Sequence, residues 1–208
     1  VLVDLLAKDR LAYLLLLNGR DRHAWSKMLA SRMALKMRGG ARAAEQQSER
    51  VLFYSADDAD MLALYRAADV VLDSFPAGGY VTSLQAFAVG APVVTLPSDY
   101  LGGRLTLAMY ERMGIHDGIA RTPLEYITIA MRLAHNPTQR AGLAARILAM
   151  NHKLFEDGGA VAEWDRFLAA AVANATIATG TSPAPPAHAA TPGARELPAA
   201  GSARSRAR

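Results

Sequence analysis

Small and hydroxylated residues gather in one stretch of the chain, in an order that suits phosphate binding. The stretch covers residues 72–98 and reads LDSFPAGGYVTSLQAFAVGAPVVTLPS. An apolar strand leads into Gly78 and Gly79, and Thr82 and Ser83 follow at the expected start of a helix. Free backbone N–H groups and the positive dipole end at a helix start bind phosphate oxygens. Glycines let the backbone turn tightly and approach a ligand.

The same residues also fit a plain strand-to-helix turn. Glycines followed by a capping threonine occur in many such turns, and the chain contains neither a P-loop nor a G-x-G-x-x-G pattern. From the residues alone, Thr82 either caps the helix or donates its hydroxyl to a phosphate oxygen. Both interpretations stay open at this point.

Other polar residues indicate less chemistry. Asp73 fits an aspartate of a strand-terminal turn better than a catalytic group, and Asp57 and Asp58 fit helix capping. The chain has no cysteine, which excludes disulfides and thiolate chemistry. No metal site is expected, because metal-ligand spacing is lacking among four scattered histidines, His23, His116, His135 and His152.

The elements around this stretch alternate between strands and helices. Apolar runs predict strands at residues 11–17, 51–55, 70–73 and 92–96, and the residue spacing predicts helices at 23–37, 57–68, 83–89 and 104–112. Gly114 is expected to end a helix, and Thr122 and Pro123 to begin the next one. Alternation with Val/Leu-rich strands predicts an α/β fold, a Rossmann-like parallel sheet flanked by helices. Ligands of such sheets bind beyond the carboxyl ends of the strands.

Composition separates a folded domain from a tail. We predict a domain over residues 1–175 with a helical C-terminal segment, and a disordered Pro/Ala/Arg-rich tail over residues 176–208. The tail holds four arginines and one glutamate of a chain whose net charge is +4, which leaves the rest at +1, so no nucleic-acid partner is expected. The most apolar run, LAYLLLL, is far shorter than the roughly 20 residues of a membrane helix, so no membrane partner is expected either.

Two longer segments resemble one family of glycosyltransferases. The first reads ADVVLDSFPAGGYVTSLQAFAVGAPVVTLPS and leads to GGRLTLAMYERMGI; the second reads PLEYITIAMRLAHNPTQRAGLAARI. Both are similar to the C-terminal catalytic half of the O-linked N-acetylglucosamine transferase and SPINDLY-like protein O-glycosyltransferases, which have the GT-B fold. The resemblance covers about Leu2 to Val172. It implies that the chain is the nucleotide-sugar-binding C-terminal half of a GT-B enzyme.

The resemblance also implies a set of binding residues. The loop and helix start over residues 78–83 would hold the donor's diphosphate, with Thr82 contacting phosphate through hydroxyl and backbone. Gln85 stands where relatives usually have a carboxylate for the ribose hydroxyls, and Arg104 either faces the diphosphate or caps its own helix. Tyr80 and Val81 differ from the glycine or histidine and the asparagine or threonine common in relatives. The implied nucleotide-sugar-binding set is Ala56 (near the base), Gly78, Gly79, Tyr80, Val81, Thr82, Ser83, Gln85 and Arg104.

In that family, tetratricopeptide repeats that select protein acceptors and a first Rossmann-like half precede this segment. The resemblance therefore implies a part of a longer enzyme, inactive by itself, with a UDP-sugar as donor substrate and no other cofactor. Its reaction would transfer a sugar to Ser or Thr hydroxyls of proteins in the cytoplasm or nucleus. UDP-GlcNAc, which supplies GlcNAc, is favoured as the donor over GDP-fucose, which supplies fucose. The alternatives are a degenerate member that binds nucleotide or protein without activity, and another GT-B enzyme acting on small molecules.

Overall fold

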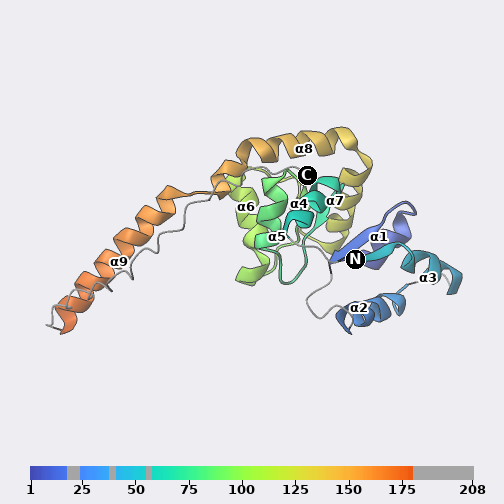
Figure 1. The fold of residues 1–208 in the computed structure, drawn as a ribbon, viewed down its shortest axis with the longest axis horizontal. Helices are drawn as coiled ribbons and strands as arrows, with labels where there is room; N and C mark the ends of the chain where they lie inside the picture. The colour runs from blue at the N-terminus through green and yellow to red at the C-terminus, as the bar shows by residue number, and fades with distance from the viewer. Residues whose placement is uncertain (18–23, 38–40, 55–57, 180–208) are drawn as a thin grey trace, which may run out of the picture. The chain divides into compact units, whose positions relative to one another are not determined.

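Helices and short strands alternate along the chain, as the apolar pattern predicts (Figure 1). The computed structural model describes residues 1–17, 24–37, 41–54 and 58–179. The elements, in chain order, are α1 (Leu2–Lys8), β1 (Leu14–Leu17), α2 (Ala24–Ala34), α3 (Ala41–Ser48), β2 (Val51–Tyr54), α4 (Asp58–Ala67), β3 (Val71–Leu72), α5 (Val81–Ala88), β4 (Val93–Val94), the 3₁₀ turn η1 (Leu101–Gly103), α6 (Leu105–Met113), α7 (Pro123–His135), α8 (Pro137–Met150), the 3₁₀ turn η2 (Asn151–Leu154) and α9 (Gly158–Thr179).

The strands pair in parallel, which confirms the predicted fold class. β1 pairs with β2 and β3 pairs with β4, each in parallel register. The prediction of one continuous sheet is wrong for the described residues, because these pairs form two separate two-stranded sheets. The strands are also shorter than the apolar runs. A run continues through residues that are apolar without being paired, whereas a strand ends where its backbone partner ends.

Helix ends follow their capping residues where the caps are clear. Thr122 Oγ1 accepts the Glu125 N–H at 3.1 Å and Pro123 stands at the first position of α7, as predicted. Gly114 ends α6 with a left-handed φ of 72°, also as predicted. α1 was not predicted. Its seven residues are too few for the helical period to stand out from the apolar run that follows.

Most of the buried core surrounds β3 and β4. Phe87 of α5 and Tyr110 of α6 are fully buried and meet edge to face, with ring centroids 4.8 Å apart. The Tyr110 hydroxyl accepts the Val93 N–H at 3.0 Å and donates to the Val93 carbonyl at 2.6 Å. α5 also contacts α4 and α8, which lie beside it in Figure 1. The core therefore fixes α5, the helix of the candidate site, on several sides.

The chain divides into two compact units, Val1–Asp157 and a second unit from Gly158 onward. In the second unit, α9 exposes apolar side chains, and Trp164 and Phe167 meet edge to face at 5.8 Å. α9 is the predicted helical C-terminal segment, and it extends through residues 176–179, which were predicted to belong to the tail. The rest of the predicted tail, from residue 180 onward, lies outside the described residues. Within the part that the structure describes, no helix is both long and apolar enough to span a membrane.

Candidate functional site

The candidate site lies where β3 ends and α5 begins. β3 leads into Asp73, a loop follows, and Tyr80 stands at the N-cap of α5. The helix has no interior glycine or proline, and its buried residues Ser83, Ala86 and Phe87 follow the three-to-four-residue spacing of one helical face. That apolar face orients α5 on the core and leaves its first turn at the carboxyl end of the parallel strands. The loop and helix thus take the position that parallel sheets use for ligands.

The first turn of α5 offers backbone donors. The helix begins at Val81, two residues earlier than predicted, and the Tyr80 side chain makes no capping hydrogen bond. Within the described residues, no acceptor is recorded for the amides of Val81, Thr82 and Ser83. These are donors that a helix leaves free at its start, and they lie at its positive dipole end. An anion could be bound there.

Thr82 does not cap the helix. It occupies the second helical position, behind the N-cap residue Tyr80, so the capping interpretation of Thr82 is wrong. Its side chain is exposed, and its hydroxyl has no recorded partner among the described residues. A Cβ atom built on Gly79 would overlap Thr82 Oγ1, so the glycine leaves room for the hydroxyl in its present position. The hydroxyl therefore stands beside the free amides with its donor available.

Gly79 and Ser83, two other predicted binding residues, form hydrogen bonds within the protein. The Gly79 N–H donates to Asp73 Oδ1 at 2.6 Å, and the Gly79 carbonyl accepts from Thr106 Oγ1 at 3.3 Å. The Ser83 hydroxyl is buried and lies 2.8 Å from Thr106 Oγ1. In this arrangement Gly79 offers no amide to a ligand, and Ser83 offers only its backbone N–H. The hydrogen-bond donors that remain available to a ligand are the backbone amides at the start of α5 and the Thr82 hydroxyl.

A second loop lies against the first one. The Gly78 N–H donates to the Gly102 carbonyl at 2.9 Å, which places the loop before Arg104 next to the glycines. Arg104 is exposed at the N-cap of α6, makes no side-chain capping bond, and reaches the Ser98 carbonyl at 3.5 Å, the limit of a hydrogen bond. The alternative in which the Arg104 side chain caps its own helix is therefore wrong, although Arg104 occupies the N-cap position, and its guanidinium keeps most of its donors available.

The remaining predicted residues lie around the same helix start, with one exception. Tyr80 and Val81 are 56% and 58% exposed, which leaves both side chains accessible at the start of α5. Gln85 is half-buried one turn further along α5. Ala56, predicted beside the base, lies outside the described residues, so its placement stays a prediction.

The structure adds supporting residues that the sequence pattern did not reveal. Thr95 Oγ1 donates to Asp73 Oδ2 at 2.8 Å, and the Tyr126 hydroxyl donates to the Asp73 carbonyl at 2.8 Å. Thr106 bonds both Gly79 and Ser83. Burial, together with the Asp73 charge, raises the pKa of the Tyr126 hydroxyl, which therefore remains protonated and can donate. The position of Asp73 at a strand end could be recognised from the sequence. Nothing in the neighbouring sequence indicated a supporting role for Thr95, Thr106 or Tyr126.

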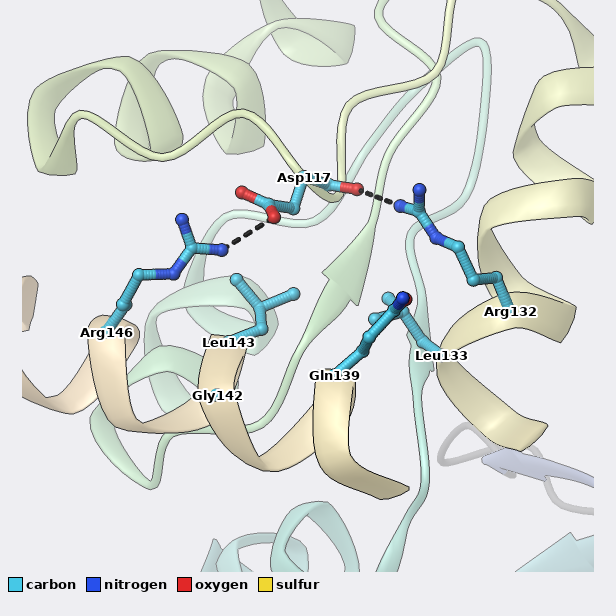
Figure 2. Close-up of a pocket in the computed structure, with 7 residues that line it drawn as sticks. All are labelled: Asp117, Arg132, Leu133, Gln139, Gly142, Leu143 and Arg146. Carbon is cyan, nitrogen blue, oxygen red and sulfur yellow. Dashed lines mark hydrogen bonds and ion pairs between the residues drawn. The ribbon is translucent and has the colours of Figure 1, made fainter. Parts of the chain in front are cut away.

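A pocket between α7 and α8 holds a different group of charges (Figure 2). Arg146 Nη2 lies 2.6 Å from Asp117 Oδ1, and Arg132 donates to the Asp117 carbonyl at 3.2 Å. Partial burial would raise the pKa of the Asp117 carboxyl, but the hydrogen bond and charge of Arg146 outweigh it, so this pKa lies below its ordinary value. None of the predicted site residues that the structure describes lines this pocket.

The Asp117–Arg146 pair predicts a small pH-dependent stability. The folded pKa of Asp117 is lowered, so its contribution is present above the unfolded pKa and is lost as the pH falls through the folded pKa. Because both side chains are exposed, Asp117→Asn should cost at most about 1 kcal/mol at pH 7, and this cost should shrink as the pH falls below the ordinary carboxyl pKa of about 4. Urea unfolding of both proteins between pH 7 and 3 measures this. Asp99→Asn, which removes an exposed carboxylate with no pair among the described residues, should show no such difference.

Among the described residues, no group of three or more His, Asp or Glu side chains could hold a metal ion. The donors at α5 are amides, a hydroxyl and a guanidinium, which bind anions rather than cations. Such donors would suit the binding of a negatively charged group.

A family model described as Glycosyl transferase family 41 matches residues 32–157, more than half of the chain. The UDP-N-acetylglucosamine–peptide N-acetylglucosaminyltransferase of Caenorhabditis elegans is 31% identical over 80 residues, 38% of this chain and 7% of that protein. The probable UDP-N-acetylglucosamine–peptide N-acetylglucosaminyltransferase SPINDLY of Petunia hybrida is 27% identical over 84 residues, 40% of this chain and 9% of that protein. The chain thus corresponds to a small part of these relatives.

A solved structure extends the similarity to most of the chain. An O-GlcNAc transferase mutant from Thermobaculum terrenum superposes with a TM-score of 0.65 and 28% sequence identity. The superposition covers 80% of this chain and 31% of that one. The matched part of the chain is therefore similar in fold to a segment of that larger transferase.

Proposed function

The chain belongs to glycosyl transferase family 41, and we propose that it forms the donor-binding part of a protein O-glycosyltransferase. The reaction would transfer GlcNAc from UDP-GlcNAc to serine or threonine hydroxyls of proteins. The observation that carries this proposal is the start of α5, where three free amides and the free Thr82 hydroxyl meet at the carboxyl end of β3. A diphosphate matches that donor set in charge and in its number of acceptor oxygens.

The other parts of the donor have candidate contacts around the same helix. Gln85, one turn into α5, has an amide that can both donate to and accept from ribose hydroxyls. Arg104 has free donors on the neighbouring loop for the phosphate charge. We propose Ala56 for the base, and the exposed Tyr80 and Val81 as further contacts of the nucleotide sugar at the start of α5. With these groups the donor would bind without a metal or other cofactor, and protein acceptors would be selected by repeats elsewhere in the full-length protein.

Nucleotide binding by the full-length protein tests the proposal. Calorimetric titration with UDP and with GDP should give binding of UDP that is tighter than binding of GDP, and UDP-GlcNAc should yield GlcNAc-modified protein. Binding of UDP without any transfer would favour a member that has lost activity. Transfer to small molecules instead of protein would favour another GT-B enzyme. No binding of either nucleotide would contradict the donor site itself.

Gln85→Glu is expected to tighten UDP binding. A carboxylate accepts a charge-assisted hydrogen bond from a ribose hydroxyl, about twice as strong as a bond to a neutral amide. The gain should be of order 1 kcal/mol, or about fivefold in affinity. Gln139→Glu makes the same chemical change on α8, in the pocket of Figure 2, and should leave the affinity unchanged. Equal affinities of the parent and Gln85→Glu would mean that Gln85 does not face the ribose.

A further inference from the structure

Asp73 has a buried carboxylate that the proposed binding of the donor does not use. It follows β3 directly, is 6% exposed, and its backbone N–H donates to the Val94 carbonyl at 2.9 Å. A buried charge is costly unless it is paired or hydrogen-bonded. Here both carboxylate oxygens accept hydrogen bonds, one from the Gly79 N–H at 2.6 Å and one from Thr95 Oγ1 at 2.8 Å.

These bonds fold the loop back over the carboxylate. A Cβ atom on Gly78 would lie 2.9 Å from Asp73 Oδ2, so the loop passes as close to the carboxylate as a glycine permits. The backbone of Gly79 is held at two successive peptide groups. Its N–H, in the peptide with Gly78, donates to Asp73, and its carbonyl, in the peptide with Tyr80, accepts from Thr106. Gly79 stands two residues before the first residue of α5. The orientation of these two peptide groups bears on how the chain enters the helix and where the free amides point.

Direct contact with a diphosphate does not suit a carboxylate, because two negatively charged groups in contact repel each other. Its geometry suits a different role. Thr95 follows β4 and Tyr126 lies on α7, so Asp73 connects the glycine loop to two elements of the rigid core. An anion site whose donors are held in advance binds more tightly, because less ordering is needed on binding.

We propose that Asp73 is a positioning residue for the diphosphate of the donor, acting through the Gly79 backbone on the amides of Val81, Thr82 and Ser83. This rests on the proposed donor site. It assigns to Asp73 an effect on phosphate binding that is separate from its effect on folding. The nucleoside part of the donor should be indifferent to it.

The test compares three variants of the full-length protein in binding to UDP and to uridine, which lacks the phosphates. Asp73→Ala removes both bonds and should weaken UDP binding about tenfold while leaving uridine binding unchanged. In Asp73→Asn the amide oxygen accepts from Gly79 and the amide nitrogen donates to the Thr95 hydroxyl, so UDP affinity should return to within about threefold of the parent. Thr95→Val removes one bond and keeps the volume, with an intermediate loss for UDP alone.

Melting curves accompany each titration, and affinities are compared well below the melting temperature. A purely structural Asp73 would lower the melting temperature of Asp73→Ala while leaving UDP affinity as in the parent, and that result would overturn the inference. Equal losses for UDP and uridine would overturn it too. Should Asp73→Ala not fold, Thr95→Val decides, since an unchanged ratio of UDP to uridine affinity contradicts the role. A parent that binds neither UDP nor GDP removes the proposed donor site, and the inference with it.

Discussion

Thr82→Ala is expected to weaken UDP binding of the full-length protein about ten- to a hundred-fold, the effect of losing one hydrogen bond to a charged group, roughly 1.5–3 kcal/mol. The hydroxyl is exposed, has no recorded partner among the described residues, and stands beside three free amides at the start of α5. Calorimetric titration of the parent and the variant with UDP measures the effect.

The stability of the fold should not change with this substitution. Thr82 is at the second helical position and caps nothing, and alanine favours a helix slightly more than threonine does. The melting temperature of Thr82→Ala should therefore equal or slightly exceed that of the parent. An unchanged melting temperature would show that the variant loses binding without losing stability. If Thr82 capped the helix, the same substitution would also lower the stability.

Two matched variants sharpen the result. Thr82→Ser keeps the hydroxyl and should restore most of the affinity. Thr128→Ala removes an exposed threonine of α7 whose hydroxyl donates to the Leu124 carbonyl in its own helix, and it should leave UDP binding unchanged. Unchanged affinity in Thr82→Ala would show that the hydroxyl does not contact the phosphates and would leave the backbone amides as the only donors of this turn.

The elements of the fold could be predicted where their signals are local. Val/Leu runs predict the strands, and Thr122, Pro123 and Gly114 predict helix ends, because capping involves residues within one turn of each other. Strand lengths and the division into two sheets could not be predicted, because both depend on which backbone lies alongside. Arg50 illustrates this limit. Its guanidinium donates to the carbonyls of Leu6, Asp9 and Ala12, some 40 residues away, and so joins the end of α1 to β2.

The candidate site divides in the same way. Gly78 to Gln85 are contiguous, so one strand–loop–helix pattern places them together. The residues that hold this loop come from elsewhere in the chain: Thr95 and Thr106 lie 22 and 23 residues from their partners, and Tyr126 lies 53 residues from Asp73. Hydrogen bonds between distant side chains have no sequence period. The pattern therefore predicted which groups lie together at the start of α5 and missed those that hydrogen-bond to the loop.

The second large effect is expected in the core beneath the site. On one edge, β4 is hydrogen-bonded to β3. On the other edge, the Tyr110 hydroxyl accepts from the Val93 N–H and donates to the Val93 carbonyl. Tyr110 and Val93 are fully buried, so water cannot replace the hydroxyl. Tyr110→Phe leaves two buried backbone groups without partners and should lower the free energy of unfolding by about 3 kcal/mol. The melting temperature should fall by about 5–10 °C.

Tyr65→Phe is the matched control for this prediction. Tyr65 of α4 is 8% exposed, and no hydrogen bond to its hydroxyl is recorded in the described part of the chain. Removing that hydroxyl should change the melting temperature little. Similar losses in the two variants would show that the two bonds to Val93 are not the cause.

Tyr110→Phe should also weaken UDP binding near its lowered melting temperature, because Thr95 follows β4 and holds Asp73. At 10 °C, where β4 stays in place, UDP binding should be unchanged. A binding defect that persists at 10 °C would mean that the β4 edge shapes the glycine loop directly, even in the fully folded protein.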